Sequence, residues 1–426
     1  MKIKNIRKNI ITESTKYPLL ILITFLIISY IYTFFHPLPS EIGEKTIGLG
    51  AEILNIGDRT FYFNETNYDY GYGDVKGGTL YPSLLKYIAI LISKVSFANS
   101  IKLWNMIVIF FASLCSIISL ILIDKSGNII FNKKVATISN LIFVLSPYTF
   151  FYSLSGGITI YVTLGCSFLT YVVVNSNLFN KSEVCHNLKF TLILLSIGVL
   201  FLSSLRPTGI VFSLVILILI SIEIYKKHRE NTIQVSKTEK YLIYFIFSLC
   251  YLYCLHELKN NTLYLNHTLE NFISEGGTFF GFEREDLRNK IFSSRTLDFN
   301  GLKSYFYLIL WKITDFVSGL SDIRDTHSNI EETPLFPFFI RTFTGIFITF
   351  PLNLLSFLGT FIFFRKIYRS GLYIPIIASL LCLVPNLLGV AFTRYLIMIS
   401  PPFIILASGV SAILINAFED QKKNIY

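Results

Sequence analysis

The side chains with the clearest capacity for chemistry are carboxylates gathered between residues 36 and 80. Seven of the 27 acidic residues fall in this polar segment. They are Glu41, Glu44, Glu52, Asp58, Glu65, Asp69 and Asp74, and only Lys45, Arg59 and Lys76 offset their charge. A carboxylate beside a hydroxyl can remove its proton, and general base catalysis of this kind contributes about 10²–10⁴-fold to a rate. The segment therefore supplies candidate general bases.

A candidate anion site follows in the turn Leu205-Arg206-Pro207-Thr208-Gly209, between two apolar stretches. Pro207 suits the first turn of a helix, because its missing N–H would be unpaired there in any case. The N-terminus of that helix adds partial positive charge beside the Arg206 guanidinium. Together these features favour a bound lipid phosphate. The alternative interpretation is an arginine that extends its charged end to the membrane surface.

A second arginine stands in the turn Phe392-Thr393-Arg394-Tyr395, beside another apolar stretch. Arg–Tyr pairs also serve as anchors at the membrane interface, so a phosphate site and an anchor both remain open there. The six histidines and six cysteines show no metal-ligand spacing. We therefore predict no metal site, although an acidic segment can bind a divalent cation.

The elements that position these residues are membrane helices. The chain of 426 residues is 53% hydrophobic and 15% charged, with a mean hydropathy of +0.58. Apolar stretches near 20 residues recur, each long enough for a bilayer helix. The candidate spans are 17–35, 101–123, 135–153, 158–174, 188–205, 207–225, 239–256, 338–364, 371–390 and 395–416. The sequence predicts an all-α polytopic membrane protein, and its net charge of +10 lies in the connectors rather than marking a nucleic-acid binder.

Loop charge predicts the orientation. Lysines and arginines cluster in the connectors 124–134, 226–240 and 365–370 and near both termini. The positive-inside rule places all of these connectors in the cytoplasm only if the apolar stretches 81–98 and 305–320 do not cross the membrane. We therefore predict ten crossings of a bacterial inner or plasma membrane, with interfacial helices at 81–98 and 305–320. Both termini then lie on the cytoplasmic side. The polar loops 36–100 and 257–337 then face outward.

The order of short motifs resembles the GT-C superfamily of integral membrane glycosyltransferases, which includes protein O-mannosyltransferases, the aminoarabinose transferase of lipid A and oligosaccharyltransferases. The matching features, in chain order, are an acidic residue soon after the first span (Glu41 or Glu44), a helix-like stretch ending Gly57-Asp58, Leu80-Tyr81-Pro82-Ser83-Leu84-Leu85, Leu145-Ser146-Pro147-Tyr148, Arg206-Pro207-Thr208-Gly209 and Arg394-Tyr395. The family usually carries Asp or Asp-Glu in the first loop, whereas this chain has Glu41-Ile-Gly-Glu44.

The resemblance implies one GT-C-like domain over 1–426 and an enzyme of the outer face. Such an enzyme moves a sugar from a polyprenyl-phosphate donor to a glycan, lipid or protein acceptor. Glu44, then Glu41 or Asp58, would be the base. The implied donor-phosphate contacts are Lys76, Arg206, Arg394 and Tyr395. No nucleotide sugar is available outside the cell, so the donor is carried by lipid.

Two other functions remain open. An O-antigen or capsule repeat-unit polymerase also has about ten spans and a long outer loop with arginines, as in 257–337 here. A flippase or transporter of lipid-linked sugars would instead show charged residues inside paired spans with repeat symmetry. The sequence shows little of either feature, so the transporter ranks third.

Overall fold

The computed structural model describes the helical body and parts of the first polar loop. The described residues are 13–35, 42–47, 51–56, 59–63, 68–70, 100–146, 158–176, 188–230, 237–260, 349–388 and 399–425, together with residues 80, 84, 149, 153 and 347. A helix lies in each of the ten predicted spans. The helices are α1 (Glu13–Phe35), α3 (Ser100–Ile130), α4 (Lys133–Leu145), α6 (Ile158–Asn175), α7 (Leu188–Ser203), α8 (Pro207–Arg229), α9 (Lys237–Asn260), α15 (Phe350–Ile362), α16 (Phe364–Ser370), α17 (Tyr373–Leu388) and α19 (Pro401–Ile425).

The apolar helices are those of a membrane protein. Within the part of the chain that the structure describes, four are long and apolar enough to cross a membrane, at Ile109–Ile130, Ile158–Asn175, Pro207–Arg229 and Pro401–Asp420. The pair α15 and α16 would make a fifth span if its bend of 83° is counted within one crossing. The predicted total of ten crossings and the cytoplasmic termini stay predictions.

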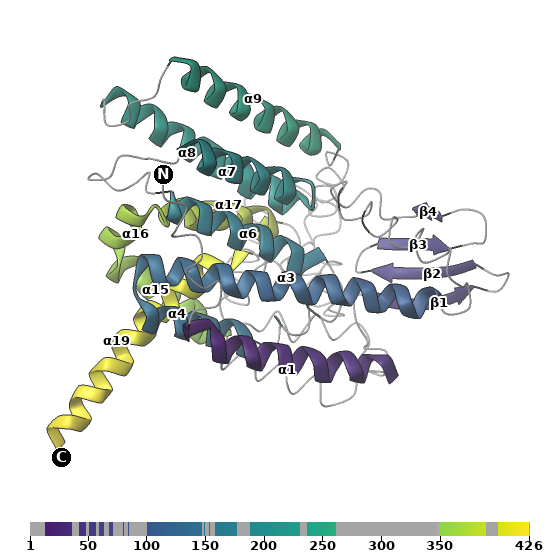
Figure 1. Ribbon diagram of the computed structural model, residues 1–426, viewed down its shortest axis with the longest axis horizontal. Coiled ribbons are helices and arrows are strands. Elements are labelled where there is room, and N and C mark those ends of the chain that lie inside the picture. Colours follow the sequence, from purple (N-terminus) through teal and green to yellow (C-terminus); the bar gives the residue numbers. More distant parts are fainter. Residues whose placement is uncertain are drawn as a thin grey trace, which may run out of the picture.

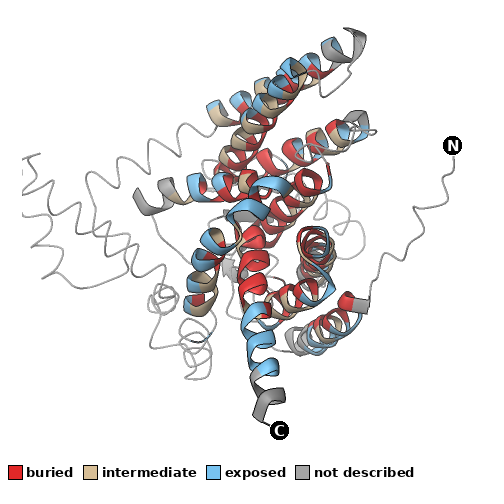
Figure 2. Cartoon of the chain, turned by 90° about the vertical axis from the view of Figure 1, so that its left-hand side faces the viewer, coloured by how far each residue is buried: buried red, intermediate tan, exposed pale blue. Residues whose placement is uncertain are grey.

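The helices pack side by side into an elongated bundle (Figure 1). Buried residues follow the faces on which helices meet, and exposed residues follow the outer faces (Figure 2). Two apolar clusters form the core. One is centred on α6, α7, α8 and α9, and the other joins α1, α3, α4 and α19.

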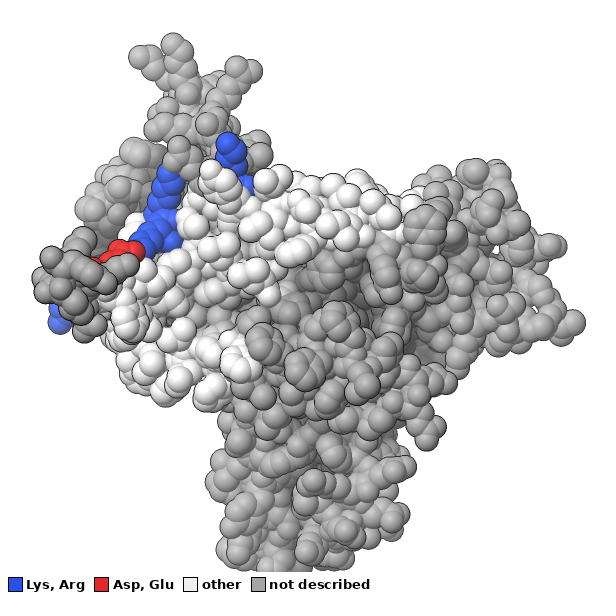
Figure 3. Space-filling model, turned by 90° about the horizontal axis from the view of Figure 1, so that it is seen from below, with Lys and Arg blue, Asp and Glu red and all other residues white. Residues whose placement is uncertain are grey.

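Basic connectors meet at one end of this bundle. The ammonium of Lys366, on α16, lies 4.6 Å from the centroid of the Phe131 ring, between α3 and α4. At the start of α4, Nζ of Lys134 lies 3.3 Å from Oε2 of Glu419 on α19. On the face in Figure 3, the described charged side chains gather at this end, beyond a broad uncharged surface. We call it the basic end.

The opposite end of the bundle carries a β-sheet (Figure 1). The four strands are β1 (Ile42–Ile47), β2 (Ala51–Ile56), β3 (Arg59–Phe63) and β4 (Tyr68–Tyr70). They form an antiparallel meander in the order β1-β2-β3-β4. The turn between α7 and α8 and the start of α3 lie at the same end. We call it the sheet end.

The sheet corrects two expectations, an all-α fold and a helix-like stretch before Gly57-Asp58. Ile56 pairs with Arg59 in register, so two residues, Gly57 and Asp58, separate β2 from β3. A Gly-Asp pair between strand-forming runs is a hairpin signal, and β3 itself is the β-prone sequence Arg-Thr-Phe-Tyr-Phe. Local turn chemistry therefore prevails over helical patterning here.

Three boundaries of the apolar spans also differ from prediction. The expected loop 124–134 is mostly helix, because α3 continues to Ile130 and leaves only residues 131 and 132 before α4. The expected loop 365–370 is the short helix α16, which ends at Gly371 with a φ of 76°. Glycine tolerates this left-handed conformation, which turns the chain into α17. In the predicted span 135–153, the helix α4 ends at Leu145, and the described residues Thr149 and Ser153 beyond it are again helical.

The remaining structural predictions concern segments outside the described residues. These are the interfacial helix 305–320, nearly all of the interfacial helix 81–98, and almost the whole of the outer loop 257–337.

Candidate functional site

Arg206 is buried at the junction of α7 and α8. Only 5% of its surface is exposed, and its backbone is extended, with φ −160° and ψ 156°. Pro207 occupies the first helical position of α8, as predicted. Arg206, the N-cap residue, makes no side-chain capping hydrogen bond to the first turn of α8. A snorkelling arginine would expose its guanidinium, whereas Arg206 is buried. Its role as a phosphate contact stays a prediction.

A tight contact sets the geometry of this turn. A Cβ added to Gly209 would lie 2.1 Å from the carbonyl oxygen of Leu202. Glycine therefore lets the first turn of α8 approach the last turn of α7 at backbone distance. The N–H of Leu205 bonds to the same Leu202 carbonyl at 3.3 Å. These contacts hold Arg206 between two helix ends.

The segment that follows Lys76 reaches the same turn. The backbone N–H of Leu80 donates a hydrogen bond of 3.0 Å to the carbonyl of Ser204, and Leu84 packs against the core cluster of α6 to α9. Lys76 itself lies outside the described residues and precedes Leu80 by four positions. A contact 124 residues apart in sequence thus joins the first polar loop to the arginine turn.

Buried polar side chains surround this region. Their exposed fractions are all 5% or less. They are Ser116 on α3, Thr149 and Ser153 before α6, Thr159 and Tyr161 on α6, Ser203, Ser204 and Arg206 at the α7–α8 turn, and Glu257 on α9. We call this set the polar layer. The hydroxyls of Ser116 and Ser153 bond to each other, which links α3 to the segment before α6.

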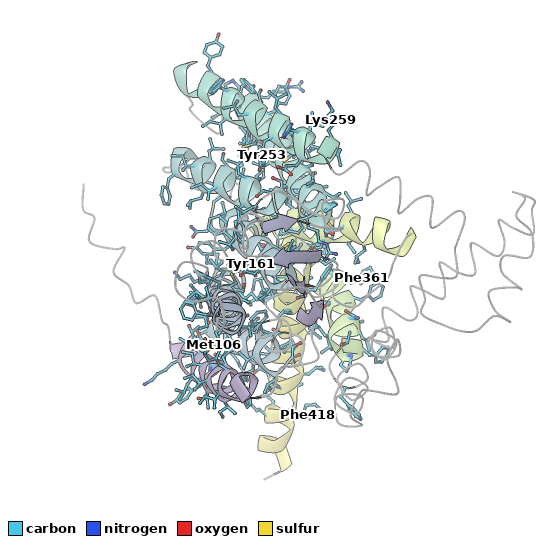
Figure 4. All side chains as sticks on the ribbon, turned by 90° about the vertical axis from the view of Figure 1, so that its right-hand side faces the viewer. Met106, Tyr161, Tyr253, Lys259, Phe361 and Phe418 are labelled. Atoms are coloured by element: carbon cyan, nitrogen blue, oxygen red, sulfur yellow. The ribbon has the colours of Figure 1, made fainter. Side chains whose placement is uncertain are left out.

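Contacts between neighbouring helices place members of the polar layer at one level. Gly165 on α6 faces Leu202 on α7, where an added Cβ would lie 2.7 Å from Leu202 Cδ1. The two helices run in opposite directions, so Tyr161, one turn before Gly165, is level with Arg206, about one turn beyond Leu202. Figure 4 looks onto the sheet end, with Tyr161 near the centre of the view.

Glu257 is a member of this layer that the sequence prediction missed. We placed it at the start of an outer loop, but α9 continues to Asn260 and buries it to 2% exposed. Cys254, one turn earlier, lies close to Ser203 on α7. Helical periodicity in the sequence could have predicted this burial. Glu257 continues the buried helical face of Ile243, Phe247, Cys250 and Cys254 at intervals of three and four residues.

The predicted base lies at the same end of the molecule. Glu44 is a residue of β1 and pairs in register with Leu54 of β2, and the sheet occupies the end at which α8 begins (Figure 1). Glu41, Asp58, Arg394 and Tyr395 lie outside the described residues, as does Lys76. Their roles as bases or phosphate contacts remain predictions. Among residues 13–425 that are described, no cluster of three or more histidine, cysteine or carboxylate ligands occurs.

Comparison with known proteins gives a distant structural likeness. No protein-family model matches the chain, and no curated protein matches it. Two solved structures of the oligosaccharyltransferase of the archaeon Archaeoglobus fulgidus superpose on it with a TM-score of 0.43. One is the apo form, at 13% identity over 96% of this chain, and the other, AglB with an inhibitory peptide and a dolichol-phosphate, is 12% identical over 97%. The chain spans about half of their length, 52% in each case.

Proposed function

We propose that the chain is a membrane glycosyltransferase that moves a sugar from a polyprenyl-phosphate donor to an acceptor at the extracytoplasmic face. The observation that carries this proposal is the burial of Arg206 at the N-terminus of α8, in contact range of the first polar loop through Leu80 and Ser204. A cationic side chain beside the N-terminus of a helix attracts an anion, because the partial positive charge of the helix end adds to its own. A lipid phosphate supplies the charge and enters from the bilayer side.

The proposed reaction is a substitution at the anomeric carbon of the donor sugar. The acceptor hydroxyl oxygen forms the new bond to that carbon, and its proton passes to Glu44, with Glu41 or Asp58 as alternatives. The bond between the anomeric carbon and the phosphate oxygen breaks, and its electron pair leaves with polyprenyl phosphate. Arg206 and the first turn of α8 stabilise that leaving phosphate, assisted by Lys76, Arg394 and Tyr395.

The sheet end could hold both the base and the contacts to the leaving phosphate. Base and leaving group must flank the anomeric carbon, within about one sugar ring and contact distance of each other. β1, which carries Glu44, and the turn that carries Arg206 occupy one end of the bundle. The uncharged hydroxyls of the polar layer, such as Tyr161 and Ser204, can bind sugar hydroxyls without competing for the phosphate.

A transporter of lipid-linked sugars, which ranks third on the sequence, has one structural observation in its favour, because two carboxylates of the described helices are buried. Asp124 is 1% exposed and Glu257 is 2% exposed. Buried carboxylates in membrane helices commonly mark transport pathways. However, Asp124 lies toward the basic end of α3 and Glu257 at the sheet end of α9, whereas transporter sites form near the middle of the bilayer.

The test uses the full chain in liposomes loaded with a radiolabelled polyprenyl-phosphate sugar. A transferase converts the donor to free polyprenyl phosphate and a labelled product when acceptor extract is added. The Arg206→Lys variant should lower this rate at least tenfold, because an ammonium cannot reproduce the two parallel donors of the guanidinium. Arg229→Lys, an exposed arginine at the other end of α8, is the matched control and should keep full activity.

Two outcomes would contradict the proposal. One is equal activity in Arg206→Lys and wild type. The other is movement of intact donor across the bilayer with no cleavage of its phosphate bond, which would make the chain a transporter.

A further inference from the structure

The helix α16 lies across the direction of α15. The two meet at Phe363 with a bend of 83°. α15 packs along α19, one of the helices long enough to cross a membrane, and the Ser356 hydroxyl on α15 donates a 2.8 Å hydrogen bond to the Phe403 carbonyl. If α15 and α19 cross the bilayer, a helix almost perpendicular to them runs along the membrane surface.

Aromatic packing fixes that bend. The rings of Phe131 and Phe363 meet edge to face, with centroids 4.7 Å apart. Both press against Gly409 of α19, where an added Cβ would lie 2.8 Å from Phe363 and 3.1 Å from Phe131. Lys366 then lies over the Phe131 ring. The orientation of α16 is therefore built into the core and does not depend on surface contacts alone.

The side chains of α16 divide by chemistry in a way that suits an interface. Ile367 is buried, at 5% exposed, and attaches the helix to the core. Phe364 and Tyr368 are 70% and 50% exposed. The three cations of the helix, Arg365, Lys366 and Arg369, are also exposed. Aromatic rings beside exposed cations are the usual composition of a segment that enters the headgroup layer.

Neighbouring elements extend the positive charge. Lys226, at the end of α8, lies close to Tyr368 and to Glu223. The Tyr368 ring stacks on Tyr373, with centroids 5.4 Å apart and planes inclined by 20°. Glu223 accepts a 3.0 Å hydrogen bond from Tyr373, so its carboxylate is held against α17. Four cations from two helices, Arg365, Lys366, Arg369 and Lys226, thus form one exposed surface.

We propose that this surface of α16 and Lys226 binds the headgroups of anionic phospholipids, with Phe364 and Tyr368 inserted among them. The charge is complementary to a phosphodiester, and the bend holds the cations at the level where headgroups lie. Each cation near an anionic membrane surface contributes about fivefold to affinity. This binding is separate from the donor-phosphate site around Arg206, which lies at the opposite end of α8.

The test counts phospholipids bound to the detergent-purified full chain by native mass spectrometry. The probes are dioleoyl phosphatidylglycerol and dioleoyl phosphatidylcholine, which share their acyl chains. Wild type should retain phosphatidylglycerol in clear preference. In the variant Arg365→Gln/Lys366→Gln/Arg369→Gln, the ratio of bound phosphatidylglycerol to bound phosphatidylcholine should be at least tenfold lower than in wild type. Lys259→Gln, an exposed lysine at the sheet end of α9, should not change it.

Further arms decide between a lipid and other anions. Arg365→Lys/Arg369→Lys should retain the preference, because a phosphodiester in the headgroup layer needs charge rather than a planar fork. If the triple variant does not purify as a folded protein, Arg369→Gln alone should weaken retention about fivefold. Equal retention of the two lipids by wild type, or unchanged preference in a folded triple variant, would overturn the proposal. Displacement of phosphatidylglycerol by equimolar inorganic phosphate would also overturn it, because it would indicate a soluble anion site.

Discussion

The hydroxyl of Tyr373, at the first residue of α17, donates a hydrogen bond of 3.0 Å to Oε1 of Glu223 on α8, 150 residues earlier in the chain. α8 and α17 also pack along each other further toward the sheet end, where the Cys382 thiol bonds to the Thr208 carbonyl at 3.3 Å. The helix that begins at Arg206 is therefore held near both of its ends by α17.

Replacement of Tyr373 with phenylalanine should weaken the basic-end contact without disturbing the site. The aromatic ring would still stack on Tyr368, but the carboxylate of Glu223 would lose a hydrogen-bond donor. A hydrogen bond to a charged group contributes about 1.5–3 kcal/mol, which partial exposure of both residues reduces toward the lower limit. Thermal unfolding of the purified chain should show a small decrease in Tm. Tyr225→Phe, an exposed tyrosine on the same helix as Glu223, is the control. Equal Tm values for the two variants would show that the bond adds no stability.

Cysteine labelling should separate the two ends of the bundle. We expect Lys259→Cys, at the sheet end of α9, to react with a membrane-impermeant maleimide in intact cells. Lys227→Cys, at the basic end of α8, should react only after permeabilisation, because the positive-inside rule keeps that end in the cytoplasm. The five described native cysteines are all buried, and a Cys185→Ser parent removes the sixth, which lies outside the described residues. External labelling of Lys227→Cys in intact cells would reverse the orientation and remove the outer-face reaction.

Gly209 should be among the least replaceable residues of the arginine turn. Its added Cβ would lie 2.1 Å from the Leu202 carbonyl oxygen, and this contact is between backbones that cannot move independently. Overpacking typically costs about 1–3 kcal/mol, and a backbone clash costs more. We expect Gly209→Ala to lower Tm sharply and to reduce binding of polyprenyl phosphate through the displaced Arg206.

Gly127 on α3 offers a matched comparison. Its added Cβ would meet the nearest atom, Cα of Ala136, at 3.3 Å. The slight crowding there opposes a gain of about 1 kcal/mol in helix propensity, so Gly127→Ala should leave Tm almost unchanged. The close-approach explanation would be wrong if the two alanine variants were equally stable.

Helix positions were predictable from the sequence because each apolar stretch exceeds the length that a soluble core could use. Helix ends were not, and Asp124 shows why. Hydropathy stops a span at a carboxylate, yet Asp124 Oδ1 accepts hydrogen bonds from Ser14 Oγ at 2.6 Å and from Asn140 Nδ2 at 2.7 Å. These donors from α1 and α4 offset the cost of burial, and α3 continues past the charge. Such partners come from distant segments and do not appear in a local pattern.

The candidate site was predictable only in part, because some of its residues carry a local sequence signal and others depend on packing between distant helices. Arg206 stood out because Pro207 marks a helix start, and that signal is local. Glu257 stood beyond the apparent end of a span, and its burial depends on packing of α9 against α7 near Ser203 and Cys254. No proline or glycine stands at the Phe363 bend, so the local sequence does not predict it. It follows from the fit of Phe131 and Phe363 around Gly409 on another helix.

The assignment of the base gives the last prediction. Replacing Glu44 with glutamine keeps the size of the side chain and removes its basicity, so the turnover number should fall by about 10²–10⁴-fold while donor binding is retained. Glu52→Gln, a glutamate on the neighbouring strand β2, is the control and should keep full activity. Transfer of radiolabelled sugar from the polyprenyl-phosphate donor measures the rate, and equilibrium binding of polyprenyl phosphate measures the donor site separately. If Glu44→Gln, Glu41→Gln and the double variant all transfer sugar at the wild-type rate, neither residue is the base, and Asp58 is the next carboxylate to replace. If instead Glu44→Gln lost donor binding as well, the carboxylate would be supporting the sheet or the donor pocket rather than accepting the proton.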